Sequence, residues 1–301
     1  RYSCPRVWIR RWRDAYGEAM TRRMLVMINE APPAYIRICT QKTTPAAFRT
    51  LLDEAGIAYT PVPGLPAALR LENSLALQAL PAAVQEQYYF QDAASQWCCR
   101  ALDAQPGEWV ADVCAAPGGK TLTVAQDMQN TGHIAAGDLY AQKCATLRHR
   151  ASVCGLSCVE VVQRDATADP PPEWMGRFDR VLCDAPCSGL GVVRRKPEIR
   201  YKQPEDFAGL PELQLCILQQ AAKLVRPGGV LQYSTCTLRP EENQQVTAAF
   251  LAAEPDFAPR VLPLPECFEA AGLPPSHEFT FLPPVQDTDG FYIAGFVRKT
   301  E

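Results

Sequence analysis

Residues 112–121 have the sequence Asp-Val-Cys-Ala-Ala-Pro-Gly-Gly-Lys-Thr and lie between a strand-like apolar run and a predicted helix. A turn rich in alanine, proline and glycine lets a ligand approach the backbone, and the free N–H groups of the following helix favour a carboxylate. A phosphate-binding loop would need glycine at the position of Cys114, and the stretch lacks GxGxxG. The sequence therefore predicts a cofactor that carries a carboxylate and no phosphate.

Strands and helices alternate on both sides of this turn, which is typical of a doubly wound parallel sheet. Asp92 is the predicted N-cap of a helix over 93–102. Strands are predicted at 108–114, 133–138, 159–163, 178–183 and 229–234, and helices near 120–128, 140–154 and 211–225. Residues 255–284 are a predicted proline-rich loop region, and 289–297 a final antiparallel strand. We expect an α/β, Rossmann-like, mostly parallel sheet.

A smaller unit is predicted before this region. Residues 5–29 have the pattern of one or two amphipathic helices, followed by a strand at 34–39, a helix at 45–55 and a strand at 57–62. We therefore predict two domains, a small α+β unit at 1–91 that faces RNA and a catalytic domain at 92–301.

Charge is unevenly distributed along the 301 residues, whose net charge is −3. Residues 1–49 contain ten basic and three acidic residues, a net charge of +7, and the remainder contains 20 basic and 30 acidic residues, a net charge of −10. A basic front predicts a polyanionic partner, although a solvated helical face explains it equally well. The chain begins at Arg1, so we expect a piece of a longer protein.

The 13 cysteines include no CxxC pair, and only three histidines accompany them. This pattern does not favour a metal site or a disulfide framework, and it predicts reduced thiols in a cytoplasmic protein. No apolar stretch approaches the roughly 20 residues of a membrane span. We expect a monomer without metal and without a membrane partner.

One aspartate lies near or just after the end of each of four predicted strands: Asp112, Asp138, Asp165 and Asp184. Singly, each could be a turn former, but the ordered series predicts a site for S-adenosylmethionine. This cofactor has a carboxylate and no phosphate. Asp138 would bind its ribose diol, and Asp165 would reach its adenine amino group.

Two further strand ends carry cysteines, Cys187 in Asp-Ala-Pro-Cys-Ser and Cys236 in Tyr-Ser-Thr-Cys-Thr. Methylation at C5 of a pyrimidine needs a thiolate that adds to C6, and a second group that assists release of the product. Asp184 could hydrogen-bond N3 of the ring, and partial burial would favour its protonated form. Neighbouring parallel strands would bring all three together. Each cysteine alone could simply be a buried apolar residue.

These Pro-Cys and Thr-Cys motifs resemble those of the RNA cytosine-C5 methyltransferases. The resemblance implies that Cys236 is the nucleophile, that Cys187 assists release, and that Asp184 faces the base. It also implies a set of contacts to S-adenosylmethionine: Cys114, Ala115, Ala116, Pro117, Gly118, Gly119, Lys120, Asp138, Asp165 and Asp184.

Residues 191–200 and 240–243 are similar to the bacterial small-subunit ribosomal RNA methyltransferase B (Fmu/Sun) group within that family. The similarity implies cytosine 967 of 16S ribosomal RNA as the target. It also implies a NusB-like domain upstream, which this sequence lacks. The basic residues after the Pro-Cys motif would contact RNA phosphates or form a solvated loop: Arg194, Arg195, Lys196 and Arg200. A transfer RNA methyltransferase and a non-catalytic ribosome-assembly factor remain the alternatives.

Overall fold

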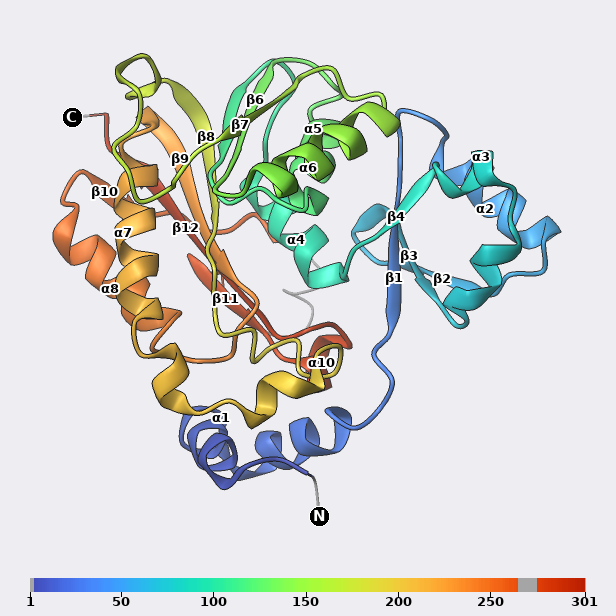
Figure 1. The fold of residues 1–301 in the computed structure, drawn as a ribbon, viewed down its shortest axis with the longest axis horizontal. Coiled ribbons are helices and arrows are strands. Elements are labelled where there is room, and N and C mark those ends of the chain that lie inside the picture. Colours follow the sequence, from blue (N-terminus) through green and yellow to red (C-terminus); the bar gives the residue numbers. More distant parts are fainter. Residues whose placement is uncertain (1–2, 265–274, 301) are drawn as a thin grey trace.

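The computed structural model describes residues 3–264 and 275–300, and it contains two separate β-sheets (Figure 1). The larger sheet has the strand order β10-β12-β9-β8-β5-β6-β7, with β11 beside β12. Its strands are β5 Trp109–Asp112, β6 His133–Asp138, β7 Val159–Gln163, β8 Phe178–Asp184, β9 Val225–Thr235, β10 Phe257–Pro259, β11 Glu278–Phe281 and β12 Phe291–Arg298.

Strands β5 to β9 pair in parallel, and β12 runs antiparallel to β9, β10 and β11. The sheet order turns back after β5, where β6 lies on one side of this strand and β8 on the other. Such a switch point opens a crevice at the carboxyl ends of the strands, where ligands bind. The predicted fold class, including the antiparallel last strand, is confirmed.

Helices cover both faces of this sheet because neighbouring strand residues point to opposite sides. Val110 of β5 packs with α4 and α5, whereas Ala111 packs with α7 and α8. The helices are α4 Ala93–Leu102, α5 Gly119–Asp127, α6 Ala141–Val153, α7 Leu210–Ala222 and α8 Gln244–Ala253. Short helices complete this part: η2 Pro172–Trp174, η3 Pro197–Tyr201, η4 Pro204–Phe207 and α10 Pro283–Gln286.

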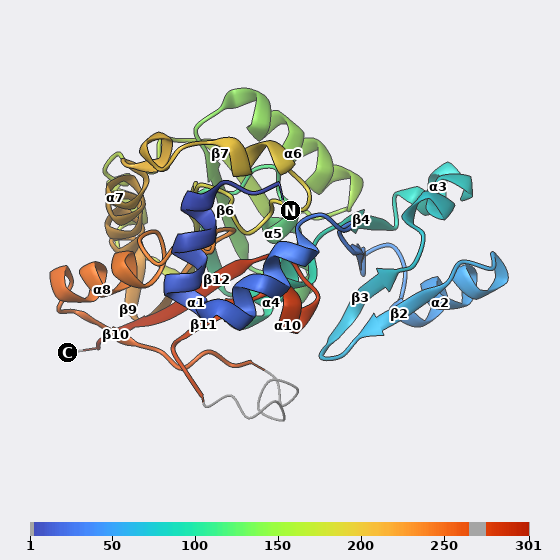
Figure 2. The same ribbon diagram turned by 90° about the horizontal axis from the view of Figure 1, so that it is seen from below.

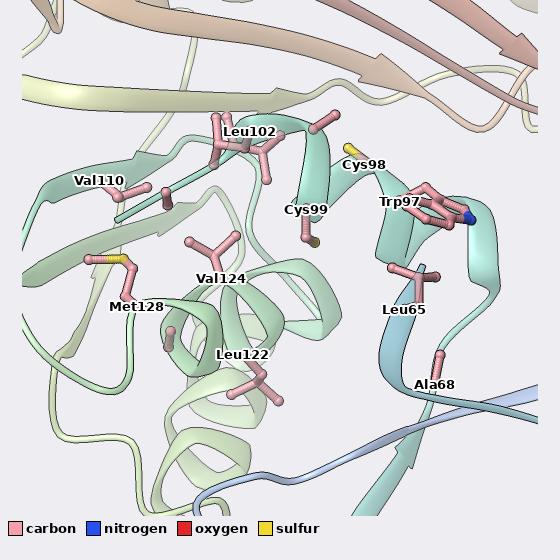
Figure 3. Packing of buried hydrophobic residues seen from close by; sticks show 14 of the residues in the cluster. Leu65, Ala68, Trp97, Cys98, Cys99, Leu102, Val110, Leu122, Val124 and Met128 are labelled. Carbon is pink, nitrogen blue, oxygen red and sulfur yellow. The ribbon is translucent and has the colours of Figure 1, made fainter. Parts of the chain in front are cut away.

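The smaller sheet is antiparallel, with the order β2-β3-β1-β4. It consists of β1 Ala34–Ile38, β2 Tyr59–Val62, β3 Leu65–Leu71 and β4 Tyr88–Phe90, accompanied by α2 Pro45–Glu54, η1 Ser74–Ala79 and α3 Ala82–Gln85. One face packs on α2 through Phe48 and Leu52. The other face contributes Leu65 and Ala68 to the core around Trp97 of α4 (Figure 3). The small sheet is therefore packed against the large domain.

Helix α1, Arg6–Met27, lies apart from the small sheet, along the base of the large domain (Figures 1 and 2). It bends at Gly17, whose φ of 79° is not helical. Trp8 and Trp12 are buried against Leu190 and Phe207, which follow the Pro-Cys motif. The apolar side of this basic helix therefore covers loops close to the candidate site.

Three details of the sequence prediction need correction. The strand predicted at 108–114 ends at Asp112, and the helix predicted to reach 225 ends at Ala222, because β9 already begins at Val225. The predicted loop region 255–284 contains β10 and β11, which form by pairing with the distant strand β12. Part of that region, 265–274, lies outside the described residues.

None of the described helices is long and apolar enough to cross a membrane.

Candidate active site

Two cavities open at the carboxyl ends of the parallel strands. Cavity A has a volume of about 410 Å³ and is bounded by segments that follow β5 to β9. Cavity B has a volume of about 560 Å³ and reaches from the turn after β5 to the small sheet. Both volumes are typical of ligand sites. Four residues line both cavities: Cys114, Ala116, Asp184 and Cys236.

The two predicted thiols lie at this junction. Cys187 follows β8, Cys236 directly follows β9, and their Sγ atoms are 3.2 Å apart. The parallel register pairs Asp184 with Ser234, and a 2.7 Å hydrogen bond between Ser188 and Thr237 holds the two loops together. Both thiols are thus positioned within reach of one heterocycle.

Neighbouring groups make the two thiols different. A hydrogen bond from the Cys187 thiol lowers the pKa of Cys236, and the positive charge of Lys120 acts in the same direction. The same hydrogen bond raises the pKa of Cys187, as do its burial and the nearby carboxylate of Glu242. Of the two thiols, Cys236 is therefore the one whose environment favours the thiolate. The catalytic roles that the sequence resemblance implied for the two cysteines stay a prediction.

Asp184 accepts two hydrogen bonds, one at each carboxylate oxygen. Lys120 Nζ donates to Oδ2 and Ser234 Oγ donates to Oδ1, both at 2.7 Å. Burial opposes the charge on Lys120, but the charge of Asp184 and its hydrogen bond, together with Cys98 and Cys99, raise the pKa of the ammonium group. The expectation that Asp184 donates a proton is not supported, because in this arrangement both its oxygens act as acceptors. Ser234, which sequence reasoning missed, stands two residues before Cys236.

The predicted cofactor turn divides between the two cavities. Cys114 and Ala116 line both, whereas Ala115, Pro117, Gly119 and Lys120 line cavity B and are not among the residues lining cavity A. Gly118 lines neither cavity; it has a φ of 106°, and an added Cβ would collide with Leu147. Gly118 is therefore required for the conformation of the turn, and it is not one of the residues that line the ligand site.

The predicted acidic side chains surround the junction. Asp138 accepts hydrogen bonds from the backbone N–H groups of Ala116 and Tyr140 at 3.2 Å each, and it lines cavity A. Asp165 also lines cavity A; one of its oxygens accepts from Thr167. Leu139 and Tyr140 add largely exposed apolar walls to this cavity. Carboxylates beside apolar walls suit a ribose and an adenine ring.

Asp112 lines cavity B and is only 2% exposed. Thr121 donates to its Oδ2 at 2.7 Å, but its Oδ1 is buried without a partner. Burial raises the pKa of Asp112 to about 7. The ammonium group of S-adenosylmethionine would supply a donor for this unsatisfied oxygen. The residues around both cavities thus fit this cofactor.

A second buried network, missed at the level of sequence, supports the Pro-Cys loop. Glu242 is fully buried and accepts hydrogen bonds from the Ser188 backbone, from Gln214 and from Arg239 at 2.8 to 3.0 Å. Gln214 also donates to the Pro186 carbonyl. The Pro-Glu-Glu-Asn segment that carries Glu242 was visible in the sequence, but its contact with the loop was not.

The four basic residues predicted to contact RNA have different environments. Arg195 pairs with Asp289 at 2.6 Å and with Asp92 at 3.1 Å, and Arg194 donates to the Ala31 carbonyl. Lys196 is exposed. These contacts link the loop to the chain segments that enter and leave the small sheet.

Arg200 does not fit the prediction, because it is 5% exposed and its donors are used internally. Its guanidinium donates to the carbonyl groups of Pro197, Ile28 and Ser3 and to the side chain of Asn29. Arg200 therefore holds the end of α1 and is not placed to contact a phosphate.

Comparison with known families agrees with this architecture, a methyltransferase sheet with a ligand site at its switch point. Residues 99–297 match the family described as 16S rRNA methyltransferase RsmB/F, and residues 4–78 match its ferredoxin-like domain. The chain belongs to the RsmB/F methyltransferase family. The predicted resemblance is thereby confirmed. Family membership likewise supports S-adenosylmethionine as the cofactor.

Individual relatives show the same similarity along the chain. The chain is 35% identical to a probable ribosomal RNA small subunit methyltransferase B of Synechocystis and 34% identical to the protein of that name in Bacillus subtilis. Each match covers 99% of the chain and 67% of the relative. The chain therefore spans about two thirds of the length of these relatives.

Solved structures share the fold. A methyltransferase homolog protein from Pyrococcus horikoshii has 26% identity and a TM-score of 0.81, covering 99% of this chain and 96% of that one. NSun6 from the same organism, solved with SFG, has 21% identity and a TM-score of 0.83, covering 99% and 98%.

Proposed function

We propose that this chain transfers a methyl group to C5 of a cytosine in small-subunit ribosomal RNA, through a covalent bond between Cys236 and C6. The observation that carries the proposal is the 3.2 Å contact between Cys187 and Cys236 at the junction of two ligand cavities. Binding of RNA alone would require neither thiol. An acid-lined cavity next to a thiol pair suits a methyl donor on one side and a base on the other.

The first step is addition of the Cys236 thiolate to C6. The new S–C6 bond displaces the electrons of the C5–C6 double bond towards C5 and the ring, which makes C5 nucleophilic. Asp184 and Lys120 form a hydrogen-bonded pair beside this position, and they can hold the N3 edge and the developing charge. S-adenosylmethionine, when bound, supplies the methyl group.

Release needs a base for the proton on C5. Once Cys236 is bonded to carbon, its sulfur no longer carries the negative charge that raises the pKa of Cys187. Cys187 then loses its thiol proton to water, and the resulting thiolate accepts the C5 proton. The C–H electrons re-form the C5–C6 double bond, the S–C6 bond breaks, and Cys236 leaves as a thiolate.

The family and the chemistry support a proposal for the substrate. Relatives are described as ribosomal RNA small subunit methyltransferases, and we propose the same RNA class here, with cytosine 967 of 16S ribosomal RNA as the specific target. The base must leave its stack to reach cavity B, which a single-stranded loop permits at low cost. A transfer RNA substrate is the alternative within this chemistry.

The decisive experiment compares three single alanine variants on ribosomal RNA. We expect Cys236→Ala to reduce methyl transfer at least about 1,000-fold, because covalent catalysis is lost, while cofactor affinity is retained. Cys187→Ala should accumulate a protein–RNA adduct that survives a denaturing gel. Cys216→Ala, which removes a partly exposed thiol of α7 that lines neither cavity, is the matched control.

Mapping 5-methylcytosine at nucleotide resolution in RNA from cells with and without the protein identifies the target. Full activity of Cys236→Ala would reject the nucleophile. Methylation confined to transfer RNA would reject the ribosomal substrate and leave the chemistry intact. Unchanged methylation of all RNA would favour the non-catalytic assembly factor.

A further inference from the structure

Cavity B extends beyond the catalytic groups to an exposed aromatic side chain of the small sheet. Phe90, the last residue of β4, is 56% exposed and lines the same cavity as Cys236. The cavity has a volume of about 560 Å³, within the range that holds a drug-sized ligand and thus more than one pyrimidine ring. Its outer part is therefore available to something other than the target base.

The strand holds Phe90 in a fixed position. Phe90 pairs with Ile36 of β1, and its ring contacts Tyr88 edge-on, with centroids 6.0 Å apart. Tyr89 between them points the opposite way, is 8% exposed and forms a 2.8 Å hydrogen bond with Thr123 of α5. A rigid, exposed aromatic face at the entrance of a nucleic-acid site is the usual platform for base stacking.

A cation accompanies this platform. Three basic residues line cavity B, and two of them are neutralised: Lys120 by Asp184, and Arg195 by Asp289 and Asp92. Arg150 of α6 forms no ion pair within the described part of the chain. One of its nitrogens donates to the Pro117 carbonyl at 2.8 Å. Its guanidinium carbon lies 5.6 Å from the centroid of the Tyr89 ring, and its remaining donors make no hydrogen bond to another described residue, so they can bind a phosphate.

We propose that Phe90 and Arg150 form a subsite for one nucleotide next to the target cytosine in the RNA strand. The neighbouring base stacks on Phe90, and Arg150 binds a phosphodiester between this nucleotide and the target. This inference rests on the proposed function for the identity of the RNA, and it names residues that hold the strand while the target base occupies the catalytic end of the cavity.

A coupling measurement tests the stacking contact. The probes are single-stranded oligoribonucleotides with one cytosine, with either a normal nucleotide or an abasic site at the position before or after it. We expect Phe90→Ala to weaken binding about 5- to 100-fold, the usual range for loss of one stacked base. At one of the two positions, the abasic probe should bind the unchanged protein more weakly than the normal probe does, by a similar factor. For Phe90→Ala, the affinities of the abasic and normal probes should differ by less than about twofold.

Controls separate stacking from folding. Phe90→Tyr keeps an aromatic face and should bind like the unchanged protein, whereas Phe90→Leu keeps only apolar bulk and should not. Leu75→Ala removes an exposed side chain from the same unit outside the cavity and should leave binding unchanged. Arg150→Gln should reduce the slope of log affinity against log salt by about 0.7.

Abasic penalties that stay the same in Phe90→Ala at both positions would overturn the subsite. The proposed methylation is assayed separately, by detecting 5-methylcytosine in a ribosomal RNA transcript. Methylation without coupling at Phe90 rejects only the subsite. Coupling without methylation supports the subsite as an RNA contact and rejects the proposed reaction.

Discussion

Cys187 and Cys236 are the same residue type 3.2 Å apart, and the hydrogen bond between them is the main cause of the opposite shifts of their pKa values. Among the nearby charges, Asp184 raises and Lys120 lowers the pKa of Cys236, whereas the buried Glu242 raises the pKa of Cys187. A positive charge favours a thiolate and a negative charge disfavours it. The pKa of each thiol thus depends on side chains from other strands and loops.

We predict that Cys236 is alkylated by iodoacetamide at a lower pH than an ordinary thiol, because the thiolate is the reactive form. The rate should rise with pH through a pKa below the usual value of 9.0. In Cys187→Ala the donor to Cys236 is lost, so the midpoint should move to higher pH. Mass spectrometry of the Cys236 peptide between pH 6 and pH 10 measures it, with Cys216→Ala as control; an unmoved midpoint contradicts the assignment.

A second prediction at the scale of single residues concerns the ion pair of Glu242. Arg239 donates to this fully buried carboxylate at 3.0 Å and is itself 8% exposed. Arg239→Met should lower the free energy of unfolding by about 3–5 kcal/mol, because it leaves a buried charge without its counterion. Arg239→Met combined with Glu242→Gln should recover part of that loss.

Urea unfolding measures both variants. The matched control is Arg226→Met, which breaks a more exposed ion pair with Asp179 and should cost about 0–1 kcal/mol. Equal losses of unfolding free energy in Arg239→Met and Arg226→Met would show that the buried network around Glu242 stabilises the protein no more than an exposed ion pair does.

Among the secondary-structure elements, α2 shows how a local sequence signal defines a boundary. Thr44 is the N-cap: its Oγ1 accepts a hydrogen bond from the Ala47 N–H at 3.1 Å, and Pro45 occupies the first turn. Because this contact is local, the helix start is visible in the sequence. Strands β3 and β4 have no comparable signal, because their positions depend on pairing with β1.

We predict that Thr44→Ala lowers the free energy of unfolding by about 1 kcal/mol, since a helix N–H loses its acceptor. Thr50 lies within the same helix, and its hydroxyl donates to the Ala46 carbonyl. Thr50→Ala should be neutral or slightly stabilising, because alanine has the higher helix propensity. Denaturant midpoints of the two variants check the difference; the same loss in both would exclude a capping effect.

At the scale of the whole molecule, α1 and the loop after the Pro-Cys motif form one packed unit. Trp8 and Trp12 fill the space beneath that loop, and Arg200 bridges its η3 turn to the end of α1. The basic N-terminal helix is therefore coupled to the position of the catalytic loop. The buried tryptophans of α1 hold the helix against this loop, whereas its basic residues supply positive charge.

We predict that Arg200→Met destabilises the protein by about 1–3 kcal/mol, because the Ile28 carbonyl and its neighbours lose their buried donor. The variant should leave the salt dependence of RNA binding unchanged. Lys196→Met, at an exposed position in the same loop, should leave stability unchanged within about 0.5 kcal/mol and reduce the salt slope by about 0.7. Thermal unfolding and RNA titrations at several salt concentrations test both; a lower slope for Arg200→Met would restore its predicted RNA contact.

The sequence by itself determined the alternation of strands and helices, the glycine turn before α5, and the acids and thiols at strand ends. These features follow from local periodicity and from the rule that parallel strands present their carboxyl ends on one side. The two-cysteine chemistry could therefore be proposed from Pro-Cys and Thr-Cys before any contact was known.

Only the tertiary structure decided which partners those residues have. It paired Asp184 with Lys120 and Ser234, buried Arg200 beneath α1, and joined Phe90 of the small sheet to the cavity of Cys236. Each of these contacts joins residues at least 50 positions apart in the chain. Local patterns carry no information about such pairs, because their distances depend on how the sheet, the helices and the N-terminal unit pack together.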